Sequence, residues 1–432
     1  MFALVAALSV AGLATVSAPA QTASDAEAPE LGRLGEQTIG TRTFELTLPD
    51  RARLGASSVT RGARRVGLRF WYPATPRAET AAVTYRHVLQ LPNAPAWTWS
   101  TAGRALENAD VVAGAAAPLV LISHGFGGWS THMSRLAEAL ATRGYVVAAV
   151  DHRDPAFDSV PTFLLSFGSV LADRAEDQRQ VLAELLRAPV PASHPMHAVD
   201  RTKIALIGYS MGGYGALSTA GAAPDAASTP LARLPAEARA GAAKIDPAVA
   251  RMIKALVLIA PWGAQPADRV WSADSLARVT APTLLIGGDK DAIVDFDGGV
   301  RWLFTGLRGA NRRLLVYREG GHNIAGDAVS IDAAASADVV GFLRDPVWRG
   351  ERINQINQHF ITAFLDLTVR GDASKAAYLD VPTPIAAEGD WPLPFGEQTQ
   401  GGVAGAGQPQ YWRGFPRGSA TGLELHTKRA GQ

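Results

Sequence analysis

The segment Lys203-Ile-Ala-Leu-Ile-Gly208-Tyr209-Ser210-Met211-Gly212-Gly213 decides the fold that this sequence predicts. An apolar run typical of a buried strand enters a G-x-S-x-G motif, and the Ala-rich stretch 214–220 that follows is typical of a helix. A serine on such a tight strand-to-helix turn requires glycine two positions before and two after it. The context therefore predicts a nucleophilic hydroxyl at Ser210 rather than an ordinary structural turn.

A serine hydroxyl needs a general base, usually histidine, to remove its proton at neutral pH. Among nine histidines, His322 follows the last strand-like run, in the Gly-rich loop Glu319-Gly-Gly-His-Asn-Ile. An acid that orients the base is expected between serine and histidine in chain order. Asp289 and Asp291 both follow a strand-like run there. We favour Asp291, which lies further into the loop, and expect Asp289 to cap or brace the turn.

The chemistry also needs two backbone N–H donors for the oxyanion of a tetrahedral intermediate. The residue after the nucleophile, Met211, supplies one. The second is expected from the loop Ser123-His124-Gly125-Phe126-Gly127-Gly128, whose glycines let the backbone approach a substrate. Phe126 N–H is the predicted donor.

Runs of Val, Ile, Leu and Ala alternate with helix-like stretches along the chain, which predicts an α/β fold with an eight-stranded, mostly parallel twisted sheet and helices on both faces. The first two strands have no helix between them and are expected to form an antiparallel edge. The strand-like runs are 43–48, 66–72, 119–123, 145–150, 204–208, 255–260, 283–287 and 314–317, and the helix-like stretches include 133–143, 172–187 and 300–307.

The remaining segments give the expected domain organisation. Residues 1–20 are uncharged and apolar and end in a small-x-small pattern, which predicts a signal peptide and export; because Lys and Arg are absent, an N-terminal anchor stays open. Residues 21–40 resemble a linker, and 41–350 form the catalytic domain. Within it, 221–250 are expected to be a small helical insertion. Residues 351–432 form a C-terminal extension that begins with a helix, 353–369.

Composition narrows the functional classes. The formal net charge is +1, with acids and bases interspersed, which gives no reason to expect a nucleic-acid partner or an obligatory membrane contact. The chain contains no cysteine, so disulfides, thiolate metal sites and a cysteine nucleophile are excluded. No metal or organic cofactor is expected.

Several of these segments resemble the α/β-hydrolase superfamily, and more narrowly bacterial proteins related to dienelactone hydrolases and platelet-activating factor acetylhydrolases. The resemblance covers roughly residues 40–345 and is carried by Phe70-Trp-Tyr-Pro-Ala, Pro118-Leu-Val-Leu-Ile-Ser-His-Gly-Phe-Gly-Gly, Gly144-Tyr-Val-Val-Ala-Ala-Val-Asp-His-Arg-Asp, Gly208-Tyr-Ser-Met-Gly-Gly and Gly320-Gly-His. The site is also similar to that of bacterial cutinases and polyester hydrolases, which implies that Phe126, Met211 and Trp262 line an apolar clamp. The sequence lacks the C-terminal disulfide common in that group. Gly125, Trp129 and His152 are further expected substrate contacts.

These observations predict a serine carboxylic ester hydrolase that forms an acyl-enzyme on small or lipid-like esters, with acetylhydrolase-like or cutinase-like substrates. Two alternatives stay open. An exported peptidase or amidase would use the same residues on a different bond, and a comparison of esters with matched amides would separate it. A non-catalytic binding protein would keep the fold, and Ser210 would then not react with a fluorophosphonate.

Overall fold

The structure is a computed structural model that describes residues 27–55, 58–76, 80–187, 189–331, 335–389, 412–416 and 418–432. Its described strands all belong to one sheet system. They are β1 (Ile39–Leu54), β2 (Val59–Thr75), β3 (Ala82–Leu89), β4 (Trp97–Glu107), β5 (Asp110–Val111), β6 (Ala117–Ser123), β7 (Val146–Asp151), β8 (Val199–Tyr209), β9 (Ile253–Ile259), β10 (Thr283–Gly288), β11 (Arg312–Tyr317) and β12 (Leu423–Lys428).

The strand order is β12-β11-β10-β9-β8-β6-β7-β2-β1-β4-β3, with β5 paired to β2. Strands β6 to β11 are parallel to their neighbours within this central block. The order along the chain reverses beside β6, because β7 lies on one side of it and β8 on the other. Ligands of open α/β sheets bind at the carboxyl ends of strands next to such a reversal, and β8 ends there.

All eight expected strands are present, and β1 pairs with β2 antiparallel as predicted. The expected edge position of this pair is wrong, because β4 and β3 continue the sheet beyond β1. The expected number of strands was nevertheless too small, because the described residues alone form twelve strands of the sheet. The missed β3 and β4 form an antiparallel ribbon that alternates buried and exposed residues, so it lacks the continuous apolar run of a central strand. The missed β12 comes from the C-terminal extension and pairs antiparallel with β11.

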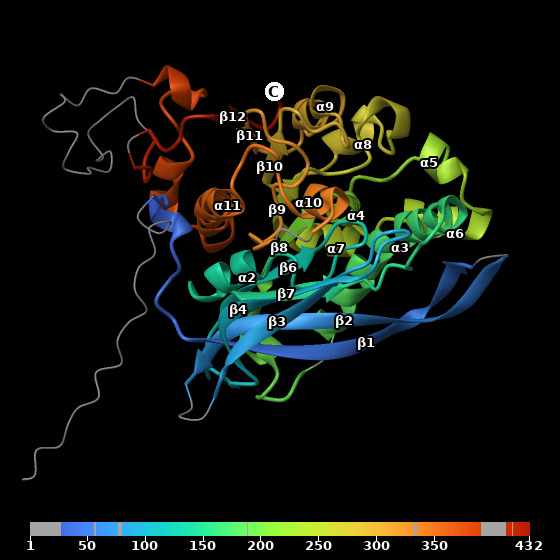
Figure 1. The fold of residues 1–432 in the computed structure, drawn as a ribbon, viewed down its shortest axis with the longest axis horizontal. Coiled ribbons are helices and arrows are strands. Elements are labelled where there is room, and N and C mark those ends of the chain that lie inside the picture. The colour runs from blue at the N-terminus through green and yellow to red at the C-terminus, as the bar shows by residue number, and fades with distance from the viewer. Residues whose placement is uncertain are drawn as a thin grey trace, which may run out of the picture.

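Helices cover both faces of the sheet (Figure 1). α3 packs on α4 and α2 packs on α11. The insertion expected at 221–250 contains three short helices, α5 to α7. The described helices are α2 (Ser134–Ala141), α3 (Val160–Arg187), α4 (Met211–Thr219), α5 (Thr229–Ala232), α6 (Ala236–Ala243), α7 (Pro247–Met252), α8 (Ala273–Ala277), α9 (Arg301–Gly306), α10 (Ala337–Leu343) and α11 (Gly350–Leu365).

Shorter helical turns link these elements. They are η1 (Glu30–Gly32), η2 (Pro195–Ala198), η3 (Pro266–Asp268), η4 (Phe296–Val300), η5 (Asp366–Arg370), η6 (Ala373–Tyr378) and η7 (Ala386–Glu388). The expected helix over 172–187 is part of α3, which begins twelve residues earlier, at Val160.

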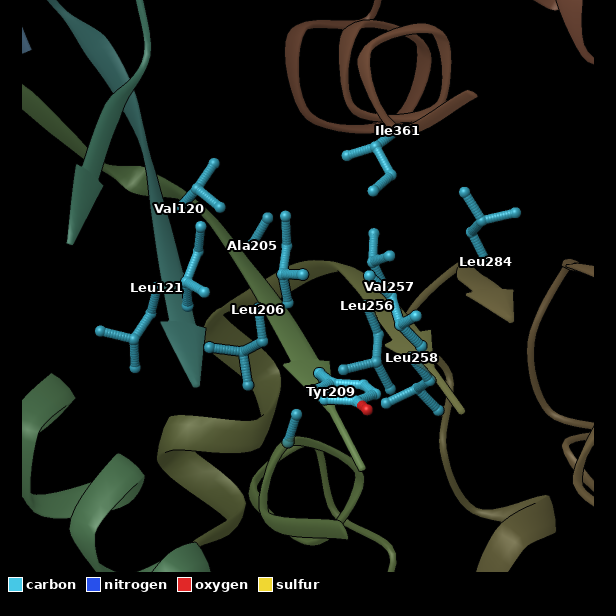
Figure 2. Packing of buried hydrophobic residues seen from close by; sticks show 14 of the residues in the cluster. Val120, Leu121, Ala205, Leu206, Tyr209, Leu256, Val257, Leu258, Leu284 and Ile361 are labelled. Atoms are coloured by element: carbon cyan, nitrogen blue, oxygen red, sulfur yellow. The ribbon is translucent and has the colours of Figure 1, made fainter. Parts of the chain in front are cut away.

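The core follows from the apolar strands. In Figure 2, Val120 and Val257 point toward Ile361 of α11, whereas Leu121 and Leu206 point to the opposite face of the sheet. Each of these side chains is at most 1% exposed. Because both faces of the central strands are covered, the sheet holds the ends of β8, β10 and β11 in fixed positions.

The chain ends take part in this packing. α11 lies on the core, and Leu31 N donates a hydrogen bond to His359 Nδ1 of α11 at 3.2 Å. The segment 27–38, expected as part of a linker, is thus packed against α11 where it is described. The predicted leader 1–20 lies outside the described residues, so export stays a prediction. Across the described ranges, no helix combines the length and apolar character needed to span a bilayer.

Candidate active site

Ser210 occupies the turn between β8 and α4. Its backbone torsions, φ 51° and ψ −116°, are ones that residues with a side chain rarely adopt. Two hydrogen bonds hold the turn: Ser210 N donates to Ile259 O at 2.9 Å, and Trp262 N donates to Ser210 O at 3.1 Å. A Cβ at Gly208 would lie 2.3 Å from Gly212 O, so this turn closes only with glycine at position 208.

His322 lies beside this serine, in the loop after β11. Its Nε2 is 3.0 Å from Ser210 Oγ, and its Nδ1 is 2.7 Å from Asp291 Oδ2. The other carboxylate oxygen of Asp291 accepts the N–H groups of Ile293 and Val294 at 2.9 and 3.2 Å. A neutral imidazole that donates Nδ1–H to the carboxylate leaves Nε2 as an acceptor for the serine hydroxyl. The structure thus brings the three predicted residues together.

Asp289, the alternative acid, does not contact the histidine in this arrangement. Its Oδ1 accepts Glu319 N–H at 2.6 Å, and its Oδ2 lies 3.3 Å from Arg318 Nε. These contacts join the end of β10 to the end of β11. Asp289 therefore braces the turn, and Asp291 is the carboxylate in position to orient the base.

The predicted oxyanion loop runs next to Ser210, because a Cβ on Gly125 would lie 3.3 Å from Ser210 Cβ. Gly125 O accepts from His124 Nδ1 at 2.7 Å and from Arg174 Nη2 at 3.4 Å. In a trans peptide the carbonyl and the following N–H point in opposite directions. Anchoring Gly125 O therefore turns Phe126 N–H away from the buried side of the loop. The other predicted donor is the N–H of Met211, the first residue of α4.

The expected substrate contact at His152 is wrong. His152 is 1% exposed, and its Nδ1 and Nε2 lie 2.8 Å from Asp177 Oδ2 and from Ser123 Oγ. Burial lowers the pKa of His152 to about 3, so the ring is neutral. Its backbone N–H donates to His124 Nε2 at 3.2 Å. This second Ser–His–Asp arrangement is closed to solvent and supports the oxyanion loop from behind.

Trp129, the other expected substrate contact, does not line the cavity beside Ser210. Its indole stacks on His132, with ring centroids 5.0 Å apart, and meets Trp99 edge-on at 5.5 Å. His132 lines the cavity beside Ser210, whereas Trp129 packs behind it, between the cavity wall and β4. The ring is held by aromatic neighbours from strands that the local sequence did not reveal.

A cavity of about 560 Å³, which we call the catalytic cavity, opens beside Ser210 and His322. This volume is in the usual range for small-molecule sites. Gly125 and Trp262 line it, as expected, and Trp262 meets Phe167 of α3 edge-on at 5.1 Å between ring centroids. The other lining residues are Phe126, His132, Phe163, Leu164, Phe167, Tyr209, Met211, Arg233, Asp268, Ile293, Asn323, Gly341 and Phe342.

The aromatic wall contributed by α3 was missed from the sequence. Phe126 lies 5.6 Å from both Phe163 and Phe167 by ring centroids. Leu164, between them in the chain, is 61% exposed. The available signal was the apolar stretch Phe163-Leu-Leu-Ser-Phe167, which ends four residues before the helix expected at 172–187.

The C-terminal extension supports the loop that carries His322. From α11, Asn357 Nδ2 donates to Ile324 O at 2.6 Å, and Asn354 Nδ2 donates to Gly326 O at 2.8 Å. Side-chain amides that satisfy loop carbonyls restrict the loop without adding secondary structure. α11 therefore helps to hold the imidazole in register with Ser210.

No group of His, Asp or Glu side chains with the arrangement of a metal site occurs among the residues that the structure describes. The protein groups that meet at the site are a hydroxyl, an imidazole, a buried carboxylate and backbone N–H donors.

Comparison with known proteins agrees with this topology. The family model of platelet-activating factor acetylhydrolase, isoform II, matches residues 68–165, and the model of the alpha/beta hydrolase fold matches residues 118–229. Cutinase 1 of Thermobifida cellulosilytica is 26% identical over 206 residues, which cover 48% of this chain and 60% of the relative. Platelet-activating factor acetylhydrolase of Cavia porcellus is 28% identical over 148 residues, with coverage of 26% and 34%.

The cutinase of Thermobifida fusca is also 26% identical, with coverage of 48% of this chain and 52% of the relative. The chain thus spans about half the length of these cutinases and about a third of the acetylhydrolase. A solved structure of a ferulic acid esterase from Streptomyces cinnamoneus aligns with a TM-score of 0.52 at 22% identity, over 80% of this chain and 94% of that one. Together with the topology, these similarities show that the chain has the α/β-hydrolase fold and resembles proteins of the platelet-activating factor acetylhydrolase and cutinase group.

Proposed function

We propose that this chain is a serine carboxylic ester hydrolase that works through an acyl-enzyme on Ser210. The observation that carries the proposal is the hydrogen-bonded series Asp291–His322–Ser210 at the wall of an apolar cavity. The names of the relatives add support, because a cutinase, an acetylhydrolase and a ferulic acid esterase all act on carboxylic esters.

In the proposed mechanism, His322 Nε2 removes the hydroxyl proton as Ser210 Oγ attacks the ester carbonyl carbon. The carbonyl oxygen becomes an oxyanion, which accepts hydrogen bonds from the N–H groups of Phe126 and Met211. Collapse of this intermediate breaks the bond to the alcohol oxygen, and the imidazolium returns its proton to that oxygen. Asp291 stays ionised and holds the imidazole in the required tautomer.

The second half of the reaction reverses these roles with water. His322 removes a proton from a water molecule, whose oxygen attacks the acyl carbon and forms a second tetrahedral intermediate. Its collapse releases the carboxylic acid and returns the proton to Ser210. The substrate class proposed from the apolar lining is a small or lipid-like ester. The catalytic domain is proposed to extend beyond the expected 41–350, because α11 packs on the core and β12 pairs with β11 in the same sheet.

Hydrolysis of short nitrophenyl esters, compared with matched anilides, tests this proposal. Ser210→Ala is expected to lower kcat by about 10⁴-fold or more, because the covalent step is lost. Ser275→Ala is a matched control, since its buried hydroxyl only donates to Ala223 O at 2.7 Å in the packing of α8. Wild-type turnover in Ser210→Ala would overturn the proposal, and faster anilide cleavage would favour an amidase.

A further inference from the structure

We propose that the catalytic cavity continues into a second apolar chamber, which takes the far end of a long unbranched acyl chain whose ester is bound at Ser210. The inference rests on the proposed esterase function. The second cavity, here the distal chamber, has a volume of about 500 Å³. Its wall includes Leu54, Leu165, Gly168, Leu171 and Leu234. It therefore lies between β1, α3 and the insertion.

The two cavities are adjacent, because four residues line both of them: Leu164, Phe167, Arg233 and Asp268. α3 contributes to each cavity along its first turns. Figure 1 shows α3, α6 and the far end of the β1–β2 hairpin together at one end of the molecule. A flexible chain that leaves the catalytic cavity along α3 would enter the distal chamber.

The lining of the distal chamber selects the class of ligand. Leu171 and Leu234 are 2% and 6% exposed, so the inner wall is aliphatic. Each methylene transferred from water to such a wall favours binding by about fourfold. Arg233 is exposed and lines the junction, where a long side chain can cover apolar surface while its charge stays in water. An alkyl chain fits this lining better than a polar or branched group.

Gly168 marks a place in the chamber wall where other elements approach α3 closely. Glycine is unfavourable in the interior of a helix, yet Gly168 lies within α3, which runs without interruption from Val160 to Arg187. A Cβ at position 168 would lie 3.0 Å from Leu54 Cδ2 and 3.5 Å from Leu234 Cδ2. Glycine therefore lets the hairpin and the insertion approach α3 closely at this point of the chamber wall, and a large side chain there would be forced against Leu54 and Leu234 and into the chamber.

The direction of the catalytic cavity assigns the acyl side of the ester to this chamber. His322 must reach the leaving alcohol, and Asn323, Gly341 and Phe342 line the cavity on the side of the histidine loop. Asn323 Nδ2 donates to Gly341 O, which joins these residues into one wall. Phe167 comes from α3 and packs against Phe126 and Trp262, so we assign the acyl group to the part of the cavity that follows α3.

The test measures kcat/KM on nitrophenyl esters from acetyl to hexadecanoyl. For the wild type, kcat/KM is expected to rise beyond the octanoyl ester. Gly168→Phe is expected to lower kcat/KM at least about tenfold for decanoyl and longer esters, and to leave acetyl hydrolysis within about twofold. Gly168→Ala is the matched control, because its small Cβ meets only the flexible ends of two leucines.

Thermal unfolding identifies a Gly168→Phe protein that does not fold. In that case Leu165→Arg replaces it, because Leu165 lies at a partly exposed position of the same wall. The same selective loss of kcat/KM for decanoyl and longer esters is expected. Equal profiles for wild type and the filled variant, with the acetyl ester still hydrolysed, would overturn the distal chamber and leave the esterase proposal standing. Failure of the wild type to hydrolyse any ester would overturn both.

Discussion

Replacing Asp291 with asparagine perturbs the proposed catalytic series at one atom. The carboxylate accepts His322 Nδ1–H through Oδ2, while its Oδ1 is occupied by the N–H groups of Ile293 and Val294. Because those two N–H groups hold the amide oxygen, Asp291→Asn would turn its NH₂ toward the imidazole. The imidazole would then carry its proton on Nε2 and could not accept the proton of Ser210.

The expected magnitude follows from this change of tautomer. A serine hydrolase whose histidine is held in the wrong tautomer loses about 10⁴-fold in kcat, or about 5.4 kcal/mol of transition-state stabilisation. Asp291 is buried behind His322, at 3% exposure, so KM is expected to stay nearly constant. The assay is the kcat and KM of a short nitrophenyl ester, with thermal unfolding measured in parallel.

Asp289→Asn in the same loop is the matched control. Its amide oxygen can still accept Glu319 N–H, and the ion pair that it loses involves Arg318, whose side chain is 51% exposed. Such exposed pairs contribute less than about 1 kcal/mol, so kcat is expected to stay within about threefold. The assignment of Asp291 as the acid would be refuted if Asp291→Asn kept more than about a tenth of the wild-type kcat. A larger loss of kcat in Asp289→Asn than in Asp291→Asn would refute it as well.

Two further predictions concern the supports of the site. Asn357→Leu removes the donor to Ile324 O and should lower kcat about tenfold, because the loop that carries His322 becomes less restricted. Thr362→Val is the control and should leave kcat unchanged, since the buried Thr362 hydroxyl has no partner among the described residues. Equal kcat values for the two variants would contradict the role of Asn357. Burial lowers the pKa of His359 to about 3, below the value of about 6.5 in the unfolded chain. Between these two pH values the unfolded chain binds a proton that the folded protein does not, so the free energy of unfolding should fall by up to about 1.4 kcal/mol for each pH unit of acidification. In urea titrations, His359→Gln should flatten that dependence, and an unchanged pH slope would count against the assignment.

Chain order and strand ends allowed much of the site to be predicted. Ser210, Asp291 and His322 each follow an apolar run, and parallel strands bring such positions to one edge of a sheet. In the structure, His322 Nε2 is 3.0 Å from Ser210 Oγ and His322 Nδ1 is 2.7 Å from Asp291 Oδ2. Tertiary packing produces these contacts, and the local motifs predicted them because the strand before each motif is clear in the sequence. The catalytic roles themselves stay predictions until they are tested.

Other features depend on partners far away in the chain. His152 was expected at the substrate because it ends a strand, but Asp177 of α3 holds its ring in the interior. The beginning of α3 was missed because Pro161 and Gly168 are typical of breaks. Proline is tolerated in the first turn of a helix, and the close approach of Leu54 and Leu234 to α3 explains the glycine at position 168.

The edge strands were missed for a related reason. Along β4, burial alternates residue by residue, so no run of apolar residues marks the strand. Similarly, β12 is stabilised by its pairing with β11, more than a hundred residues earlier in the chain. Such long-range pairing leaves little trace in a local sequence pattern.

The central claim is that His322 activates Ser210 for covalent chemistry. Intact-protein and peptide mass spectrometry after treatment with a fluorophosphonate measures this directly. We predict a single phosphonyl adduct on Ser210 of the wild type, no adduct in Ser210→Ala, and labelling slowed by about 10³-fold or more in His322→Asn. An adduct on another residue, or labelling of Ser210 at the wild-type rate without His322, would contradict the account.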